Sequence, residues 1–211
     1  MGFDVVVLLK FILKFYILVT LIHFLVKKTN NNVLKAILVL TVVNIIITDV
    51  FLFLDLKIAF NNNIYVVLLF LLWLFLLKKT TALKNINYYL FVFILFSLFN
   101  LFFYEGFYKL NTKTFVFGTL IYLLLFVEIC FVNLKNEKLS FFLSNILILL
   151  SSPILFFVGY SFMFGFDNKI INDVEIIKGV KLFDIISNLV NFTFYTLINI
   201  YIFKQNKECT T

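Results

Sequence analysis

The sequence predicts an all-α fold, a polytopic membrane protein built as a bundle of seven transmembrane helices. Hydrophobic residues make up 63% of the 211 residues and charged residues only 14%, whereas roughly 45–50% of a soluble domain is apolar. A soluble chain of this length cannot remove so much apolar surface from water, so lipid must surround most of it. The apolar residues also form long runs without the strict alternation of a membrane β-barrel, and such runs predict helices.

Seven apolar runs stand between polar segments. A helix rises about 1.5 Å per residue, so about 20 apolar residues cross the bilayer core. Together the runs predict one domain over residues 1–211, with helices at approximately 5–26, 33–54, 64–77, 88–104, 115–134, 140–164 and 180–203. The third run is short, so its helix is expected to include flanking residues or to span a thinned region of the bilayer. Lys27 and Lys28 follow the first run where a signal peptide would carry small residues, so this run is expected to remain as a helix.

The distribution of lysine predicts the orientation of the chain. Ten of the 18 lysines follow the first, third, fifth and seventh runs, and six, together with most of the acidic residues, lie in the connections on the other side. Lysine-rich connections stay on the cytoplasmic side of a membrane. The sequence therefore predicts a multi-pass protein of the bacterial inner (cytoplasmic) membrane, with its N-terminus outside and its C-terminus in the cytoplasm.

The longest polar connection covers residues 165–179 and lies outside in this orientation. Its apolar residues Ile170, Ile171, Val174 and Ile177 have the spacing of one helix face, which suits a short helix lying in the membrane interface. A loop resting on the lipid headgroups is the simpler alternative, and a ligand lid or partner epitope is the functional one.

Composition and motifs exclude several classes of protein. The lysines are dispersed at the ends of apolar runs and form no continuous stripe, so no nucleic-acid partner is expected. The zinc motif HExxH, the nucleophile motif GxSxG and a glycine-rich phosphate loop are all absent from the sequence. No lysine lies in the middle of the seventh run, which disfavours a retinal-binding protein. We therefore expect no cofactor, no metal and no enzymatic activity, and the lipid bilayer as a partner.

Ionisable residues inside the apolar runs are the candidate functional residues, because each costs at least about 2.5 kcal/mol at bilayer depth unless it is paired or solvated. Lys14 lies deeper than its side chain easily spans, and Asp49 and Asp184 fall near the same predicted level. Lys10 lies one turn earlier on the same helix face, so either lysine could pair with Asp49. For Lys10, reaching the interface with its long side chain is the simpler explanation. With neighbouring amides, the predicted ligand-binding residues are Lys14, Asp49, Asn100, Asp184 and Asn188.

Two further residues are predicted to couple such a site to the rest of the bundle. Glu128 lies in the inner half of the fifth run, with Asn145 and His23 at comparable levels, which suits either a proton relay or a neutral, hydrogen-bonded glutamate. Pro153 removes one backbone donor and crowds the carbonyl of Leu149, so it is expected to kink the sixth helix. The kink is either a hinge or a simple bend.

Several short segments act as landmarks along the chain. They are Asn44, residues 62–65 (NNIY), Trp73 followed by Lys78 and Lys79, residues 140–142 (SFF) and 157–160 (FVGY), and Asn188 with Asn191. In these segments the chain resembles a family of small, largely uncharacterised bacterial seven-helix integral membrane proteins. That family in turn resembles the seven-helix membrane sensory module of some histidine kinases, which implies work beside a separate membrane signalling protein.

Three hypotheses for function follow. The first is a membrane-embedded sensory or accessory module, in which the outer polar residues form a ligand pocket and the sixth helix transmits its occupancy to a separate signalling partner. The alternative is a small transporter or channel, although the first three and last three runs show no self-similarity. The third is an intramembrane lipid hydrolase, because residues 48–53 (TDVFLF) faintly resemble the aspartate-containing helix of lysoplasmalogenase-like membrane proteins.

Overall fold

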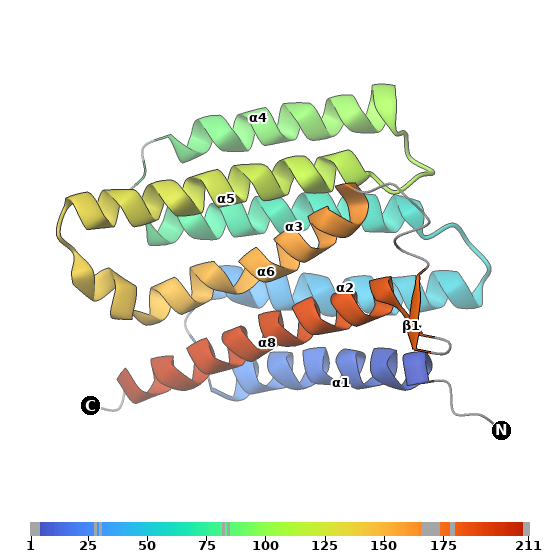
Figure 1. The fold of residues 1–211 in the computed structure, drawn as a ribbon, viewed down its shortest axis with the longest axis horizontal. Helices are drawn as coiled ribbons and strands as arrows, with labels where there is room; N and C mark the ends of the chain where they lie inside the picture. The colour runs from blue at the N-terminus through green and yellow to red at the C-terminus, as the bar shows by residue number, and fades with distance from the viewer. Residues whose placement is uncertain are drawn as a thin grey trace. The chain divides into compact units, whose positions relative to one another are not determined.

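The structure is a computed structural model that describes residues 5–27, 29, 31–81, 83, 85–165, 174–177 and 180–208. Long α-helices dominate the described residues (Figure 1). They are α1 Val5–Val26, α2 Asn32–Phe53, α3 Ala59–Thr80, α4 Ile86–Phe99, α5 Thr112–Lys135, α6 Asn145–Gly165 and α8 Leu182–Glu208. The shorter elements are a π-helical turn η1 Asn100–Tyr104, a 3-10 helix η2 Leu139–Leu143 and an antiparallel hairpin of β1 Glu175–Ile177 and β2 Val180–Lys181.

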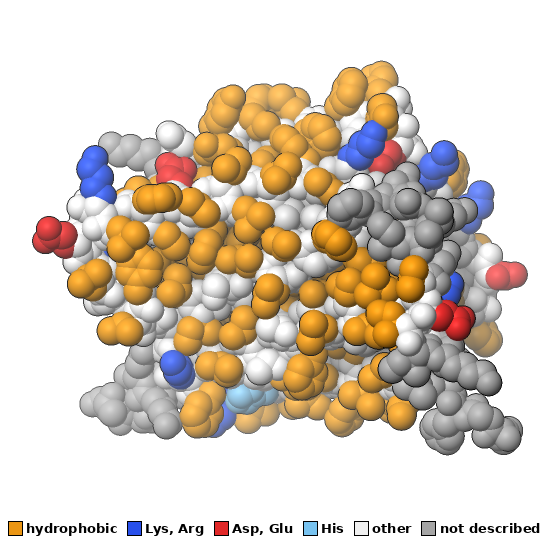
Figure 2. Space-filling view, in the orientation of Figure 1, with side chains coloured by type: hydrophobic (Ala, Val, Ile, Leu, Met, Phe, Trp, Pro, Cys, Tyr) orange, Lys and Arg blue, Asp and Glu red, His pale blue; other side chains and the backbone are white. Residues whose placement is uncertain are grey.

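The all-α fold with seven spans is confirmed. Within the described residues, seven helical segments are long and apolar enough to cross a membrane, and they include Ile86–Tyr104, where η1 extends the short α4. Figure 2 shows hydrophobic side chains covering the middle of the helices on the face it draws, with charged side chains towards the helix ends. This distribution is the one that a bilayer core with polar interfaces selects.

The helix boundaries differ from the predicted ones where polar residues find local partners. α3 begins at Ala59 and ends at Thr80, so it takes in flanking polar residues such as Asn61 and Asn63. The continuous sixth helix predicted from residue 140 is wrong at its start, because η2 ends at Leu143 and α6 begins at Asn145. The Ser144 hydroxyl accepts a hydrogen bond from the backbone N–H of Leu147, which caps the new helix start.

The predicted interfacial helix is also wrong where the structure describes it. Residues 175–177 form strand β1, which pairs with β2 and leads directly into α8. Residues 166–173, which the same prediction included, lie outside the described residues. The seventh helix accordingly begins at Leu182 instead of residue 180, and it continues to Glu208.

The chain divides into two compact units. The first, called here the α1/α6/α8 unit, contains Met1–Thr29 and Ser144–Thr211, and the second, the α2–α5 unit, contains Asn30–Leu143. In the first unit α8 packs against both α1 and α6. Gly159 lets α6 approach α8 closely, since a Cβ at this position would lie 2.5 Å from Val190 Cγ1.

In the α2–α5 unit α3 packs against α2, α4 and α5. The fully buried ring of Phe70 lies at the centre of this packing, with ring centroids 5.6 Å from Phe93 and 5.2 Å from Phe115. Gly118 makes room for that ring, because a Cβ there would lie 2.8 Å from the Phe70 Cγ. The core of this unit is therefore aromatic and closely packed.

Candidate functional site: polar networks of the two units

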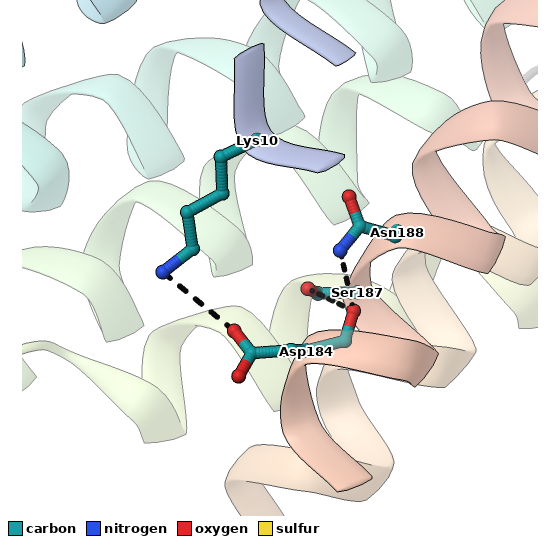
Figure 3. A network of polar contacts seen from close by, with 4 residues as sticks. All are labelled: Lys10, Asp184, Ser187 and Asn188. Carbon is teal, nitrogen blue, oxygen red and sulfur yellow. Dashed lines mark hydrogen bonds and ion pairs between the residues drawn. The ribbon is translucent and has the colours of Figure 1, made fainter. Parts of the chain in front are cut away.

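An ion pair joins α1 to the start of α8. Lys10 Nζ lies 3.6 Å from Asp184 Oδ1, and the Lys10 side chain is 61% exposed while that of Asp184 is only 13% exposed. Figure 3 shows Lys10 reaching across from α1 towards the first turn of α8. The backbone carbonyl of Asp184 accepts hydrogen bonds from Ser187 Oγ at 3.2 Å and Asn188 Nδ2 at 2.6 Å. The first turn of a helix favours a negative charge, so Asp184 is well placed as a carboxylate.

A second polar contact ties α6 to the same part of α8. Asn191 Nδ2 donates to the hydroxyl of Tyr160 at 2.8 Å and to the carbonyl of Ser187 at 2.7 Å. Ser187 in turn donates from its hydroxyl to the Asp184 carbonyl, which connects this contact to the ion pair. Lys10, Asp184, Ser187, Tyr160 and Asn191 therefore form one network that touches all three helices of the unit. We call it the Asp184 network.

Further polar contacts follow the α1–α8 seam away from this network. The hydroxyls of Tyr16 and Thr196 share a hydrogen bond of 3.0 Å. Asn199 Nδ2 donates to Thr20 Oγ1 at 2.8 Å, and Asn199 Oδ1 accepts from His23 Nδ1 at 2.8 Å. Contacting residue numbers rise together along the two helices, so α1 and α8 run parallel and are joined at several levels.

The α2–α5 unit has its own polar network at the end of α4. Glu105 accepts hydrogen bonds from the buried Asn100 amide at 2.6 Å, from the Thr112 hydroxyl at 2.8 Å and from the Lys113 backbone N–H at 3.2 Å. Asn100 also donates to the buried Thr114 hydroxyl at 2.9 Å. The carboxylate therefore caps the first turn of α5 and clamps it to η1.

Asn63 of α3 holds the connection between η1 and α5. Its Nδ2 donates to the carbonyls of Lys109 at 2.8 Å and Phe107 at 3.5 Å, and its Oδ1 accepts from the Asn111 backbone N–H at 2.8 Å. Asn63 is buried, so these bonds replace solvation that the amide has lost. Together, Asn63 and Glu105 fix residues 105–111 against the helix ends.

Pro153 lies within α6, and the helix continues through it. Proline cannot donate to the carbonyl of Leu149, its partner four residues earlier. The buried Ser152 hydroxyl donates to that carbonyl at 2.8 Å instead. The missing backbone hydrogen bond is thus replaced by a neighbouring side chain, as membrane helices require.

The predicted ligand-binding residues fall in both units. Asp184 and Asn188 lie one turn apart in α8, and Lys14 is exposed on α1 of the same unit. Asn100 is buried at the end of α4, and Asp49 is exposed on α2, both in the α2–α5 unit. Pairing of Lys14 with Asp49 stays a prediction.

Glu128, a predicted coupling residue, is half-buried on α5. Its side chain makes no hydrogen bond or ion pair with the residues that the structure describes. His23, one of its predicted neighbours, bonds Asn199 within the other unit. The proton-relay hypothesis for Glu128 stays a prediction.

Several residues in the two networks had no predicted site role. Lys10 forms the ion pair with Asp184, although its position near the helix start suggested an interfacial lysine. Glu105, Asn63 and Tyr160 were not predicted either. Glu105 gave no local signal, because it lies seven residues before Thr112, and N-cap patterns concern the residue immediately before a helix.

No group of three or more His, Cys, Asp or Glu side chains within the described ranges is arranged to hold a metal ion. Comparisons of this chain with protein-family models, curated proteins and solved structures found no match.

Proposed function

We propose that this chain is a sensory or accessory module of the bacterial inner membrane that acts through a separate signalling partner. The Asp184 network carries the proposal. It brings a carboxylate, an ammonium group, a phenol and an amide together at the junction of the β1–β2 hairpin with α8.

In this network, Lys10 can be replaced as the partner of Asp184. The 3.6 Å separation of the ion pair and the 61% exposure of Lys10 indicate a weak contact, and such pairs contribute roughly 0–1 kcal/mol. A ligand that presents an amine or another donor can therefore replace Lys10 at Asp184 at low cost. Lys14 and Asn188 are the nearby predicted ligand-binding residues, and the proposal does not depend on Asp49 or Asn100.

The fold offers a route from this site to the other end of the unit. α8 is one helix of 27 residues that begins next to Asp184, and 27 residues correspond to roughly 40 Å of rigid helix. Its contacts to α1 and α6 are polar at several levels. A change at Asp184 can thus shift α8 relative to its neighbours, and Pro153 marks where α6 is expected to adapt.

The proposal is tested by locating a partner and its dependence on Asp184. A photo-crosslinking residue is placed at Leu189 or Ile200, both exposed on α8, and at the exposed Phe131 of α5 as a matched control. We expect adducts with a membrane signalling protein from α8 and none from Phe131. Asp184→Leu is expected to alter that partner's phosphorylation, and Asp55→Leu, which changes an exposed acid between α2 and α3, is not.

The proposal fails if the folded, inserted protein forms no α8 adduct with a signalling protein. It also fails if Asp184→Leu and Asp55→Leu leave the partner's phosphorylation equally unchanged.

A small transporter or channel is the second candidate, and the polar seam between α1 and α8 favours it. Tyr16 with Thr196, and Thr20 and His23 with Asn199, place hydrogen-bonding side chains at successive levels of two spanning helices. Purified protein in liposomes would then carry protons or ions. Flux that is abolished by Glu128→Gln would support this candidate. Flux no greater than that of protein-free liposomes would exclude it.

A further inference from the structure

We propose that the end of the α2–α5 unit around residues 105–111 binds the phosphate headgroup of an anionic phospholipid through Lys57 and Lys113. This inference is independent of the proposed sensory function, because it concerns the other unit. Four observations support it: the placement of the lysines on tyrosine rings, a rigid connecting loop, the position of the loop at the ends of three spans, and adjoining exposed phenylalanines.

Each lysine lies over an exposed tyrosine ring. Lys113 Nζ is 3.7 Å from the Tyr104 ring centroid, and Lys57 Nζ is 5.2 Å from that of Tyr108. The two rings are 65% and 76% exposed. A ring face occupies one side of an ammonium group and leaves N–H donors free to point outwards. The tyrosines therefore hold the two charges in place without neutralising them.

The loop that carries Tyr108 is held rigidly. Asn63 binds backbone groups of residues 107, 109 and 111, and Glu105 caps the start of α5 just before Lys113. A surface that is already ordered loses little conformational entropy when it binds a ligand. The Glu105 carboxylate makes these hydrogen bonds and forms no ion pair with a lysine among the described residues.

The two lysines lie at the ends of candidate membrane spans. Lys57 precedes the span Ala59–Thr80 by two residues, Tyr104 ends the span Ile86–Tyr104, and Lys113 is the second residue of the span Thr112–Lys135. Ends of membrane-spanning helices lie in the headgroup region, where lysine and tyrosine are favoured. Lys57, Lys109 and Lys113 have no ion-pair partner among the described residues, and the exposed Asp55 is the nearby acid outside the cap.

Exposed aromatic residues adjoin these charges. Phe102 and Phe103 of η1 are exposed next to Tyr104. The surface therefore offers positive charge for a phosphate beside apolar rings for acyl chains. A phospholipid can contact both the lysines and the aromatic rings, whereas inorganic phosphate can contact only the lysines.

Native mass spectrometry of the full chain, with dioleoylphosphatidylglycerol or dioleoylphosphatidylcholine added in mild detergent, tests this. The wild type is expected to retain phosphatidylglycerol in preference to phosphatidylcholine. Lys57→Gln with Lys113→Gln is expected to lower phosphatidylglycerol retention roughly thirtyfold, because each lysine near an anionic membrane surface contributes about 1 kcal/mol of attraction. Lys78→Gln with Lys79→Gln, two exposed lysines at the other end of α3, is the matched control and is expected to retain it.

Equal retention by the two double variants would overturn the proposal, as would equal retention of both lipids by the wild type. Inorganic phosphate that binds alone, or displaces the lipid at millimolar concentration, would identify a free-anion site and also overturn it. Thermal unfolding in lipid-free detergent checks that both double variants are folded. Lys113→Arg alone is expected to keep the lipid, since arginine also binds phosphate and packs on an aromatic ring.

Discussion

The α1–α8 seam and the α3–α4–α5 core hold their helices together by different means. The seam uses hydrogen bonds and one ion pair, with Tyr16, Thr20 and His23 bonded to residues of α8. The core uses packed rings and a glycine, with Phe70 against Phe93, Phe115 and Gly118.

The difference matters because polar and packing contacts have different energies in a membrane. An interhelical hydrogen bond there averages about 0.6 kcal/mol, since alternative partners are available when it breaks. A buried aromatic ring that is removed leaves a cavity that the surrounding helices fill only partly. We infer that the seam can change register cheaply, whereas the core acts as a fixed scaffold.

The largest loss of stability is expected for a substitution in the α3–α4–α5 core. Phe70→Ala is expected to lower the free energy of unfolding by about 3 kcal/mol, because it opens a cavity between α3, α4 and α5. Phe91→Ala on the same unit removes a ring that is 59% exposed and is expected to change it by less than about 0.5 kcal/mol. Unfolding in bicelles measures the free energy of unfolding of both variants. If the two variants lose similar stability, Phe70 is not the centre of the packing.

The next effect concerns the backbone of α6. Ser152→Ala leaves the Leu149 carbonyl without its side-chain donor, and a buried unsatisfied carbonyl costs about 1–3 kcal/mol. In a Pro153→Ala background the residue at 153 can donate its own N–H, so the same serine change is expected to cost far less. A double-mutant cycle of unfolding free energies measures this coupling.

Ser151→Ala is the control for that cycle, because the Ile148 carbonyl that Ser151 contacts can still accept the ordinary backbone hydrogen bond from Ser152. An additive cycle would mean that Ser152 does not replace the donor lost at Pro153.

A smaller effect is expected at the seam. Asn199→Leu removes the contacts to Thr20 and His23 and is expected to cost about 1 kcal/mol, the sum of two average interhelical hydrogen bonds. Thr193→Val on the same helix removes only a hydrogen bond to the Leu189 carbonyl within α8 and serves as the control. If Asn199→Leu lowers the free energy of unfolding as much as Phe70→Ala does, the seam and the core do not differ in strength.

The smallest effect on stability is expected at Lys10. The Lys10 side chain is 61% exposed, and glutamine keeps a hydrogen-bond donor for Asp184, so Lys10→Gln should change the free energy of unfolding by less than about 0.5 kcal/mol. The same variant should still alter the partner's phosphorylation if Asp184 is the input site. A variant that is destabilised by more than about 1 kcal/mol would show that the pair is a structural contact.

Some residues of the candidate site could be predicted from the sequence, and others could not. A polar residue inside an apolar run can be recognised from the sequence without any knowledge of tertiary contacts, which identified Asp184, Asn188 and Asn100. The pairing of Lys10 with Asp184 could not be predicted, because Lys10 and Lys14 share one helix face. Asn63 also gave no clear signal, since its partners are backbone groups more than 40 residues away.

The sequence by itself determined the seven apolar spans and their approximate ends, because a bilayer selects helices by length and hydropathy, which are local properties. The tertiary structure alone decided that the connection before α8 forms a β-hairpin at residues 175–177 and 180–181, and that Glu105 and Asn63 fix the loop before α5. It also decided which side chains meet across helices. That choice depends on how each helix is rotated and shifted against its neighbour, and hydropathy carries no information about either quantity.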